Sequence, residues 1–475
     1  MRRRRRRRKN TIKAIIFFAI VVAVILVATT ALKGCDRDGA DKKPGGQEII
    51  GGIEQVDPNA GEGTATDSRD SILADADLLA AQYDYDAAIE MVKAMDGYDS
   101  DTELQAKVAD YEAVKATCVP VNIEEVTHIF YHTLTVDEQR CFGNQANDRQ
   151  CIGNNQWMTT VDEFNAITQE MYDRGYVLVS IHDLYDTVID ENGKEKMVPG
   201  TIMLPADKKA FVLSLDDLSY YHSYDNYGFA ARLIIDENGD VMNEYYDAEG
   251  NLHIGAYDCV PLLDQFVEAH PDASYRGAKG IIAMTGYNGV LGYRTDESYT
   301  IGHKYNDAHM RKWMEAHPDF TIESERAAAK EVADAMKANG WEFASHTWGH
   351  LRVGEKGLET LKADQERFKN NVVPVVGEVD TIIFAHGEDL EDWGPYDTAN
   401  NAKYQYFKSQ GYDVFCNVDA HQYAVWLEED YMRMGRRNLD GYRIYFNAIG
   451  EQNNLSDLFD AAEILDTDRP PVPAL

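Results

Sequence analysis

Two short segments of this 475-residue chain carry side chains that could bind one metal ion together. In segment 211–217, a mainly apolar run ends in Asp216 and Asp217. Such a run predicts a buried strand that presents both carboxylates at its C-terminal end. Segment 345–350 contains His346 and His350, and their i, i+4 spacing predicts a helix or helical turn that directs both imidazoles to one ion.

These residue types favour a hydrolytic metal site. One carboxylate and two imidazoles hold a divalent ion while leaving coordination positions open, and the second carboxylate can act as a base. An Asp pair or a His-x-x-x-His motif alone is usually an ordinary surface feature. The combination of the two, each next to an apolar strand, indicates a functional site.

The surrounding pattern alternates between strands and helices. Apolar runs predict strands over 126–132, 175–181, 210–217, 341–344, 379–385 and 414–418. Helices are expected from Thr160 and over 327–338. Because the reactive residues follow strands, we expect an α/β barrel with its site on the C-terminal face. Segment 234–300, rich in Gly, Asn and Tyr, is predicted to be a large loop insertion over that site.

From about 119 to 445, the chain resembles the NodB-like polysaccharide deacetylases, metal-dependent carbohydrate esterases built on a distorted (β/α)7 barrel. Leu215-Asp216-Asp217 matches the first motif of that family, and His346-Thr347-Trp348-Gly349-His350 matches the second. The resemblance implies that Asp216 is the catalytic base and that Asp217, His346 and His350 bind the metal. It implies zinc first, with cobalt, nickel and manganese as alternatives, and an N-acetylated polysaccharide as substrate.

Two family motifs are changed in this chain. The third motif normally supplies an arginine, but segment 384–389 offers only His386, which we consider as the general acid. The Leu-x-His of the fifth motif is missing near 442–445. Arg433, Arg436 or Arg437 could replace the missing arginine from a later loop. Two other functions therefore stay open: a non-catalytic barrel that binds glycan, and a metal-dependent amidohydrolase acting on a small amide.

The N-terminus predicts a membrane protein. Arg2 to Arg8 precede the uncharged segment 14–32, whose length approaches the roughly 20 residues of a transmembrane helix. The positive-inside rule places the arginines in the cytoplasm and the rest of the chain outside the cell. A cleaved signal peptide, or a lipoprotein modified at Cys35, are the alternatives.

Four regions are therefore expected. They are a cytoplasmic polybasic tail with a single-pass transmembrane anchor (1–35), a flexible linker (36–67), a helical hairpin similar to a tetratricopeptide repeat (68–118), and the barrel (119–475). The formal net charge is −35 and no basic cluster follows the N-terminal one, so we expect no nucleic-acid partner.

Overall fold

The computed structural model of the chain describes residues 63–475. The predicted tail and anchor, and the linker as far as residue 62, lie outside the described residues. Within 63–475, no helix combines the length and the apolar character needed to cross a bilayer.

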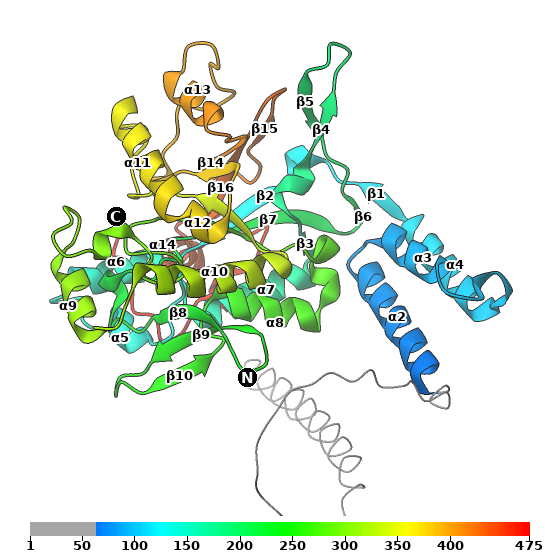
Figure 1. Cartoon of the computed structure of the whole chain (residues 1–475), viewed down its shortest axis with the longest axis horizontal. Coiled ribbons are helices and arrows are strands. Elements are labelled where there is room, and N and C mark those ends of the chain that lie inside the picture. The colour runs from blue at the N-terminus through cyan, green and yellow to red at the C-terminus, as the bar shows by residue number, and fades with distance from the viewer. Residues whose placement is uncertain (1–62) are drawn as a thin grey trace, which may run out of the picture. The chain divides into compact units, whose positions relative to one another are not determined.

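Seven parallel strands form a closed barrel, and several of them are labelled in Figure 1. In chain order they are β2 (Thr127–Tyr131), β7 (Lys209–Asp216), β11 (Ile281–Met284), β12 (Glu342–Ser345), β13 (Thr381–Ile383), β14 (Val414–Val418) and β16 (Met432–Asn438). Each strand pairs with the next, and β16 pairs with β2 to close the ring. The short strand β3 (Tyr176–Leu178) pairs with the first part of β7. The prediction of a seven-stranded α/β barrel is confirmed.

Alternation along β7 separates the two sides of the barrel wall. Leu213 and Leu215 belong to the core shared with the surrounding helices, whereas Ala210 and Val212 belong to a second core inside the barrel. Because successive strand residues face opposite sides, Ser214 and Asp216 face the interior with Val212. The sequence pattern thus directs Asp216 into the barrel, at the end where all seven strands terminate.

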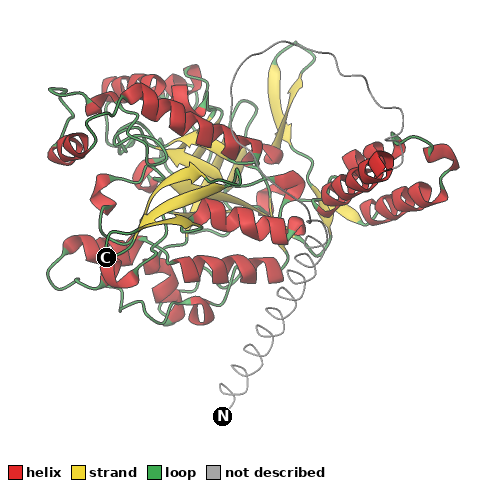
Figure 2. Ribbon diagram, turned by 60° about the horizontal axis from the view of Figure 1, so that its bottom comes forward, coloured by secondary structure: helices red, strands yellow, loops and turns green. Residues whose placement is uncertain are grey.

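Helices surround the strands (Figure 2). The helices that contribute to the outer core are α7 (Val161–Asp173), α8 (Cys259–Ala269), α10 (Ile322–Ala338), α11 (Leu358–Asn371), α12 (Val373–Val376), α14 (Gly441–Ala448) and α15 (Ala461–Ile464). The buried residues of α10 are Ala329, Val332, Ala333 and Met336, the spacing of one helical face. Thr160 and Glu163 form a capping box that starts α7.

The predicted insertion is shorter than expected. Segment 234–300 contains the barrel strand β11, so it is not a loop throughout. Before β11, the chain forms a three-stranded antiparallel sheet of β8 (Ala230–Ile235), β9 (Val241–Tyr246) and β10 (Leu252–Gly255), followed by α8. The sequence did not identify β11 because only four apolar residues form it, between segments rich in turn residues.

The predicted helical hairpin contains three helices instead of two. They are α2 (Gly63–Ala81), α3 (Tyr85–Lys93) and α4 (Thr102–Lys115). Asp84 caps α3 by accepting the amide hydrogen of Ala87, and Asp101 caps α4. The Tyr83 hydroxyl donates to the Asp272 carbonyl at 2.8 Å, and the Arg276 amide donates to the Gln82 carbonyl, also at 2.8 Å. The turn between α2 and α3 is thereby attached to the barrel domain.

The remaining elements lie outside the barrel wall. They are the hairpin β4 (Tyr185–Ile189) and β5 (Glu195–Pro199), the pair β1 (Cys118–Pro120) and β6 (Met203–Pro205), β15 (Val425–Leu427), and helices α5 (Glu138–Phe142), α6 (Arg149–Trp157), α9 (Ala308–Ala316) and α13 (Ala402–Ser409).

His182 joins three elements at the N-terminal end of the barrel, away from the candidate site. Its Nδ1 lies 3.1 Å from Glu342 and its Nε2 lies 3.0 Å from Asp380. Burial lowers the pKa of His182, but hydrogen bonds to Asp380 and Glu342 outweigh this effect and raise the pKa to about 10. The stabilisation is complete below the unfolded-state pKa of about 6.5 and is lost as pH rises through 10.

We expect His182→Gln to lower the free energy of unfolding at pH 6 by about 1 kcal/mol, a small value because a third of the side chain is exposed. At pH 10.5 the variant and the parent should differ much less. Thermal melts at both pH values measure this difference. An equal loss at both would show that the imidazolium charge contributes nothing.

Candidate metal centre

Asp216 and Asp217 lie where β7 ends on the C-terminal face of the barrel. Asp216 is the last strand residue, and Asp217 has a left-handed backbone with φ of 64°. This conformation is uncommon for a residue other than glycine, and it is concentrated at functional sites. The turn at Asp217 allows two successive carboxylates to enter the same site, although side chains in a regular strand would face opposite sides.

The two histidines come from the loop after β12. The predicted helical turn is wrong, because residues 346–350 form an irregular loop with left-handed φ at Thr347 (62°) and His350 (52°). Asp364 on α11 fixes this loop by accepting the amide hydrogens of Trp348 and Gly349 at 2.7 and 2.8 Å. Tertiary hydrogen bonds, and not helical spacing, therefore bring both imidazoles to one place.

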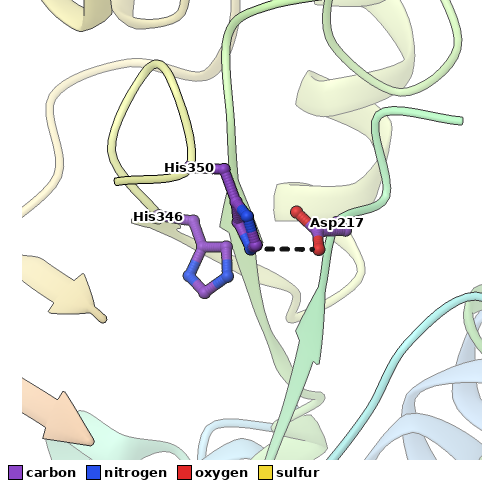
Figure 3. A group of neighbouring side chains, drawn as sticks. All are labelled: Asp217, His346 and His350. Atoms are coloured by element: carbon purple, nitrogen blue, oxygen red, sulfur yellow. Dashed lines mark ion pairs between the residues drawn. The ribbon is translucent and has the colours of Figure 1, made fainter. Parts of the chain in front are cut away.

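Asp217, His346 and His350 converge (Figure 3). One ligand atom from each residue lies within 4.8 Å of the others. The His350 Nε2 is 3.5 Å from an Asp217 carboxylate oxygen, the pair marked by the dashed line in Figure 3. Asp217 and His346 are buried, and His350 is partly exposed. The three predicted ligands are therefore close enough to hold a metal ion.

Neighbouring groups prepare these side chains to bind a cation. The His346 Nδ1 donates to the Ile383 carbonyl at 2.7 Å, which leaves Nε2 as the free nitrogen. Burial lowers the pKa of His346 to about 4, so the ring is neutral at physiological pH. The Tyr221 hydroxyl donates to one oxygen of Asp217 at 2.5 Å, while the other oxygen lies toward His350. Two nitrogens and one oxygen suit zinc and other divalent transition metals.

Asp216 forms a bidentate ion pair with Arg436. The Arg436 guanidinium, on β16, donates to the two carboxylate oxygens at 2.7 and 3.0 Å. Burial raises the pKa of Asp216, but Arg436, followed by His346, outweighs this effect and brings the pKa well below its ordinary value. Asp216 is therefore ionised, and its Oδ2 lies 3.8 Å from the His346 Nε2.

Arg436 is one of three arginines considered from the sequence. Arg433 pairs with Asp389 and Arg437 pairs with Asp457, so only Arg436 reaches the base candidate. It lies on a barrel strand and not on a loop as expected. Of the three arginines considered, Arg436 is thus the one that pairs with Asp216.

His386, the sequence candidate for the general acid, lies beside the three ligands. Its ring centroid is 4.2 Å from that of His350, and its Nε2 donates to the His350 carbonyl at 3.2 Å. The residue is exposed and has a left-handed φ of 61°. The structure therefore brings His386 to the site, and its role as the general acid stays a prediction.

His132 was not selected from the sequence, yet it also reaches this site. It follows β2, whose Tyr131 pairs with Leu215 of β7, so His132 stands level with Asp216. His132 is close enough to Asp216 to help lower the pKa of that carboxyl, after the larger effects of Arg436 and His346. Within residues 63–475, its ring has no hydrogen-bond partner. Its position after an apolar strand was the one sequence signal that could have identified it.

The fold and the site thus define a seven-stranded α/β barrel with a candidate metal centre on its C-terminal face. No protein-family model matches the chain, and the comparison with curated proteins finds no relative. Among solved structures, the Streptococcus pyogenes deacetylase PplD in complex with acetate is similar, at 16% sequence identity and a TM-score of 0.32. The match covers 67% of this chain and 93% of that one. A likeness of this size supports no conclusion about activity.

Proposed function

We propose that this protein is a metal-dependent deacetylase that removes N-acetyl groups from an amino sugar of a cell-wall or extracellular polysaccharide. The convergence of Asp217, His346 and His350 beside an ionised Asp216 carries this proposal. The motif resemblance to NodB-like polysaccharide deacetylases supports the choice of substrate.

Each side chain then has a distinct task. Asp217, His346 and His350 would hold the metal, which when bound lowers the pKa of a water molecule and polarises a carbonyl group. Asp216 accepts the proton of the attacking water. Arg436 keeps the Asp216 carboxylate ionised and fixes its orientation through two hydrogen bonds. A histidine gives a proton to the departing amine, so that acetate and a free amino sugar result.

The ion pair between Asp216 and Arg436 favours a catalytic barrel over one that only binds glycan. The changed third and fifth motifs were the reason to consider a barrel without activity. Arg436 supplies the missing interaction at 2.7 Å, with both partners buried. Arg436 thereby keeps ionised the carboxylate that has to act as a base, which a catalytic barrel requires.

Two histidines can supply the proton, and His132 is our first choice. His132 follows β2, which pairs with β7, the strand that carries Asp216. His386 follows β13, which pairs with β12, the strand before His346. The Nε2 hydrogen of His386 is already donated to a backbone carbonyl, whereas no hydrogen bond within 63–475 engages the His132 ring.

We expect His132→Gln to lower kcat by about 10²–10⁴-fold, typical of a lost acid–base group, and His386→Gln to lower it by less than about tenfold. Both variants should retain the metal ion, measured by elemental analysis. The opposite order of effects would assign the general acid to His386.

We also propose that the chain is anchored in the cell membrane, with the barrel outside. The uncharged segment 14–32 and the arginines before it support this topology. Protease added to intact cells should digest the barrel and leave a short membrane-bound fragment. Protection of the barrel would exclude this topology, and release of the barrel into the medium would favour a cleaved signal peptide.

Acetate release is the direct test of the proposed function. The purified full chain, loaded with zinc, cobalt, nickel or manganese, is incubated with chitooligosaccharide and with peptidoglycan. We expect acetate from at least one substrate, and none after chelation. If metal binds but no N-acetylated glycan is turned over, the glycan-binding alternative is favoured. Release of ammonia or acid from small amides alone would favour the amidohydrolase.

A further inference from the structure

A large open cavity, which we call the Arg294 groove, begins beside the candidate metal centre. It has a volume of about 1200 Å³ and lies between the sheet of β8, β9 and β10 and the chain from Trp313 to Glu325. Tyr221 belongs to its lining and also donates its hydroxyl hydrogen to Asp217. The groove therefore shares Tyr221 with the surroundings of the metal centre, although Asp217, His346 and His350 do not line it.

Aromatic side chains line the Arg294 groove on two sides. Tyr246 on β9 is 45% exposed, and Trp313 and Phe320 are partly buried on the facing segment. Tyr224 also lines the groove, and its ring lies 5.5 Å from that of Tyr221. Flat apolar surfaces combined with a few fixed polar groups are typical of small-molecule and sugar sites. The groove is thus suited to several linked sugar rings.

Arg294 supplies an unpaired positive charge to this groove. Only 5% of the residue is exposed, and within 63–475 it forms no ion pair. Its Nη1 donates to the carbonyls of Tyr220 and Asn288, both at 3.0 Å. Its Nε is buried and has no partner in the described chain. Nη2 has no partner in the described chain either and, unlike Nε, is not fully enclosed, so it can donate to a ligand in the groove.

The carboxylates of the groove do not neutralise Arg294. Glu244 pairs with Arg232, and Asp225 accepts from His222. Glu325 accepts the backbone amide hydrogen of Arg294 at 2.7 Å. Glu249 and Asp319 are exposed. A buried guanidinium with unpaired hydrogen-bond donors lowers the stability of the fold unless a ligand accepts from them.

We propose that the Arg294 groove binds an acidic sugar residue of the polysaccharide, with the Arg294 guanidinium holding its carboxylate or phosphate. This inference rests on the proposed function and specifies its substrate as an anionic glycan. The oxyanion would accept a hydrogen bond from Nη2 of Arg294, and neighbouring sugar rings would contact Tyr246 and Trp313. The acetylated residue would then lie toward Tyr221 and the metal centre.

The test measures binding of three probes to the full chain in detergent micelles: N-acetylglucosamine 1-phosphate, glucuronic acid and uncharged N-acetylglucosamine. We expect at least one anionic probe to bind more tightly than the neutral sugar. Arg294→Met should weaken that probe by roughly 10- to 100-fold, as expected for hydrogen bonds to a charged group. Whichever anionic probe binds more tightly identifies phosphate or carboxylate as the recognised group.

Arg232→Met is the matched control, because its guanidinium lines the same groove but is already paired with Glu244. The affinity of the Arg232→Met variant for the anionic probes should stay within about threefold of the parent's affinity. Arg294→Lys, which keeps the charge, is measured if the Met variant does not fold. It should lose affinity by about tenfold, because an ammonium group does not present a donor where the planar guanidinium does. Unchanged affinity in the folded Arg294 variants, or equal binding of neutral and anionic probes, would overturn the proposal. These binding results are independent of acetate release. If the parent releases no acetate, the proposed deacetylase function is rejected, but the proposed binding of an anionic sugar is not.

Discussion

Asp217→Ala is expected to abolish metal binding and acetate release together. Asp217 contributes the single carboxylate among the three converging ligands, and the Tyr221 hydroxyl holds it in place at 2.5 Å. Replacing residues that merely orient a ligand costs 10–100-fold in metal affinity, so loss of the ligand itself should exceed about 100-fold. Elemental analysis after dialysis and the acetate assay measure both losses on the same sample.

Tyr221→Phe is the matched control for this variant. It removes one hydrogen bond to Asp217 but leaves all three ligands, so metal affinity should fall by no more than about 10–100-fold. Full metal content in Asp217→Ala would show that the ion is held elsewhere. The assignment of Asp217, His346 and His350 as ligands would then be rejected.

Asp216→Asn is expected to keep the metal and to lower kcat by about 10²–10⁴-fold, because the amide cannot accept the proton of water. The structure adds a second effect that the motif alone does not predict. Arg436 has no exposed surface and its carboxylate partner is Asp216. Breaking a buried pair from one side costs about 3–5 kcal/mol, so the variant should also melt at a lower temperature.

A double variant separates these two effects. Asp216→Asn combined with Arg436→Met removes the unpaired charge, and it should regain part of the lost stability without regaining turnover. Thermal melts and the acetate assay on the parent, the single variant and the double variant give the comparison. If Asp216→Asn loses the metal while Asp217→Ala retains it, the roles of the two carboxylates are reversed.

The sequence predicted the barrel well where apolar strands are long. Two examples are β7 and β14, which consist mainly of apolar residues and end at the candidate site or near it. The strand β16 was not predicted, because Arg433, Arg436 and Arg437 make it look like a polar loop. In the structure each of these arginines has a carboxylate partner, and a partner distant in sequence cannot be inferred from local pattern.

The ligand set was predicted correctly in residue identity but not in local conformation. A spacing of four residues suggested helical geometry for His346 and His350, whereas two left-handed residues and the carboxylate of Asp364 determine the loop. Backbone conformations of this kind depend on tertiary hydrogen bonds that no periodicity encodes. His132 follows an apolar strand, but its place level with Asp216 is set by the register between β2 and β7.

The pairing of Asp216 with Arg436 also affects when the protein can become active during its synthesis. The two residues are 220 positions apart, and Arg436 lies on the last strand to join the ring. Until that strand has been made, β2 lacks one neighbour and the Asp216 carboxylate lacks its cation. Contacts over such separations form slowly, since a long chain segment must be closed first. The candidate catalytic centre therefore assembles only when almost the whole polypeptide is present, and fragments that end before Met432 should be inactive.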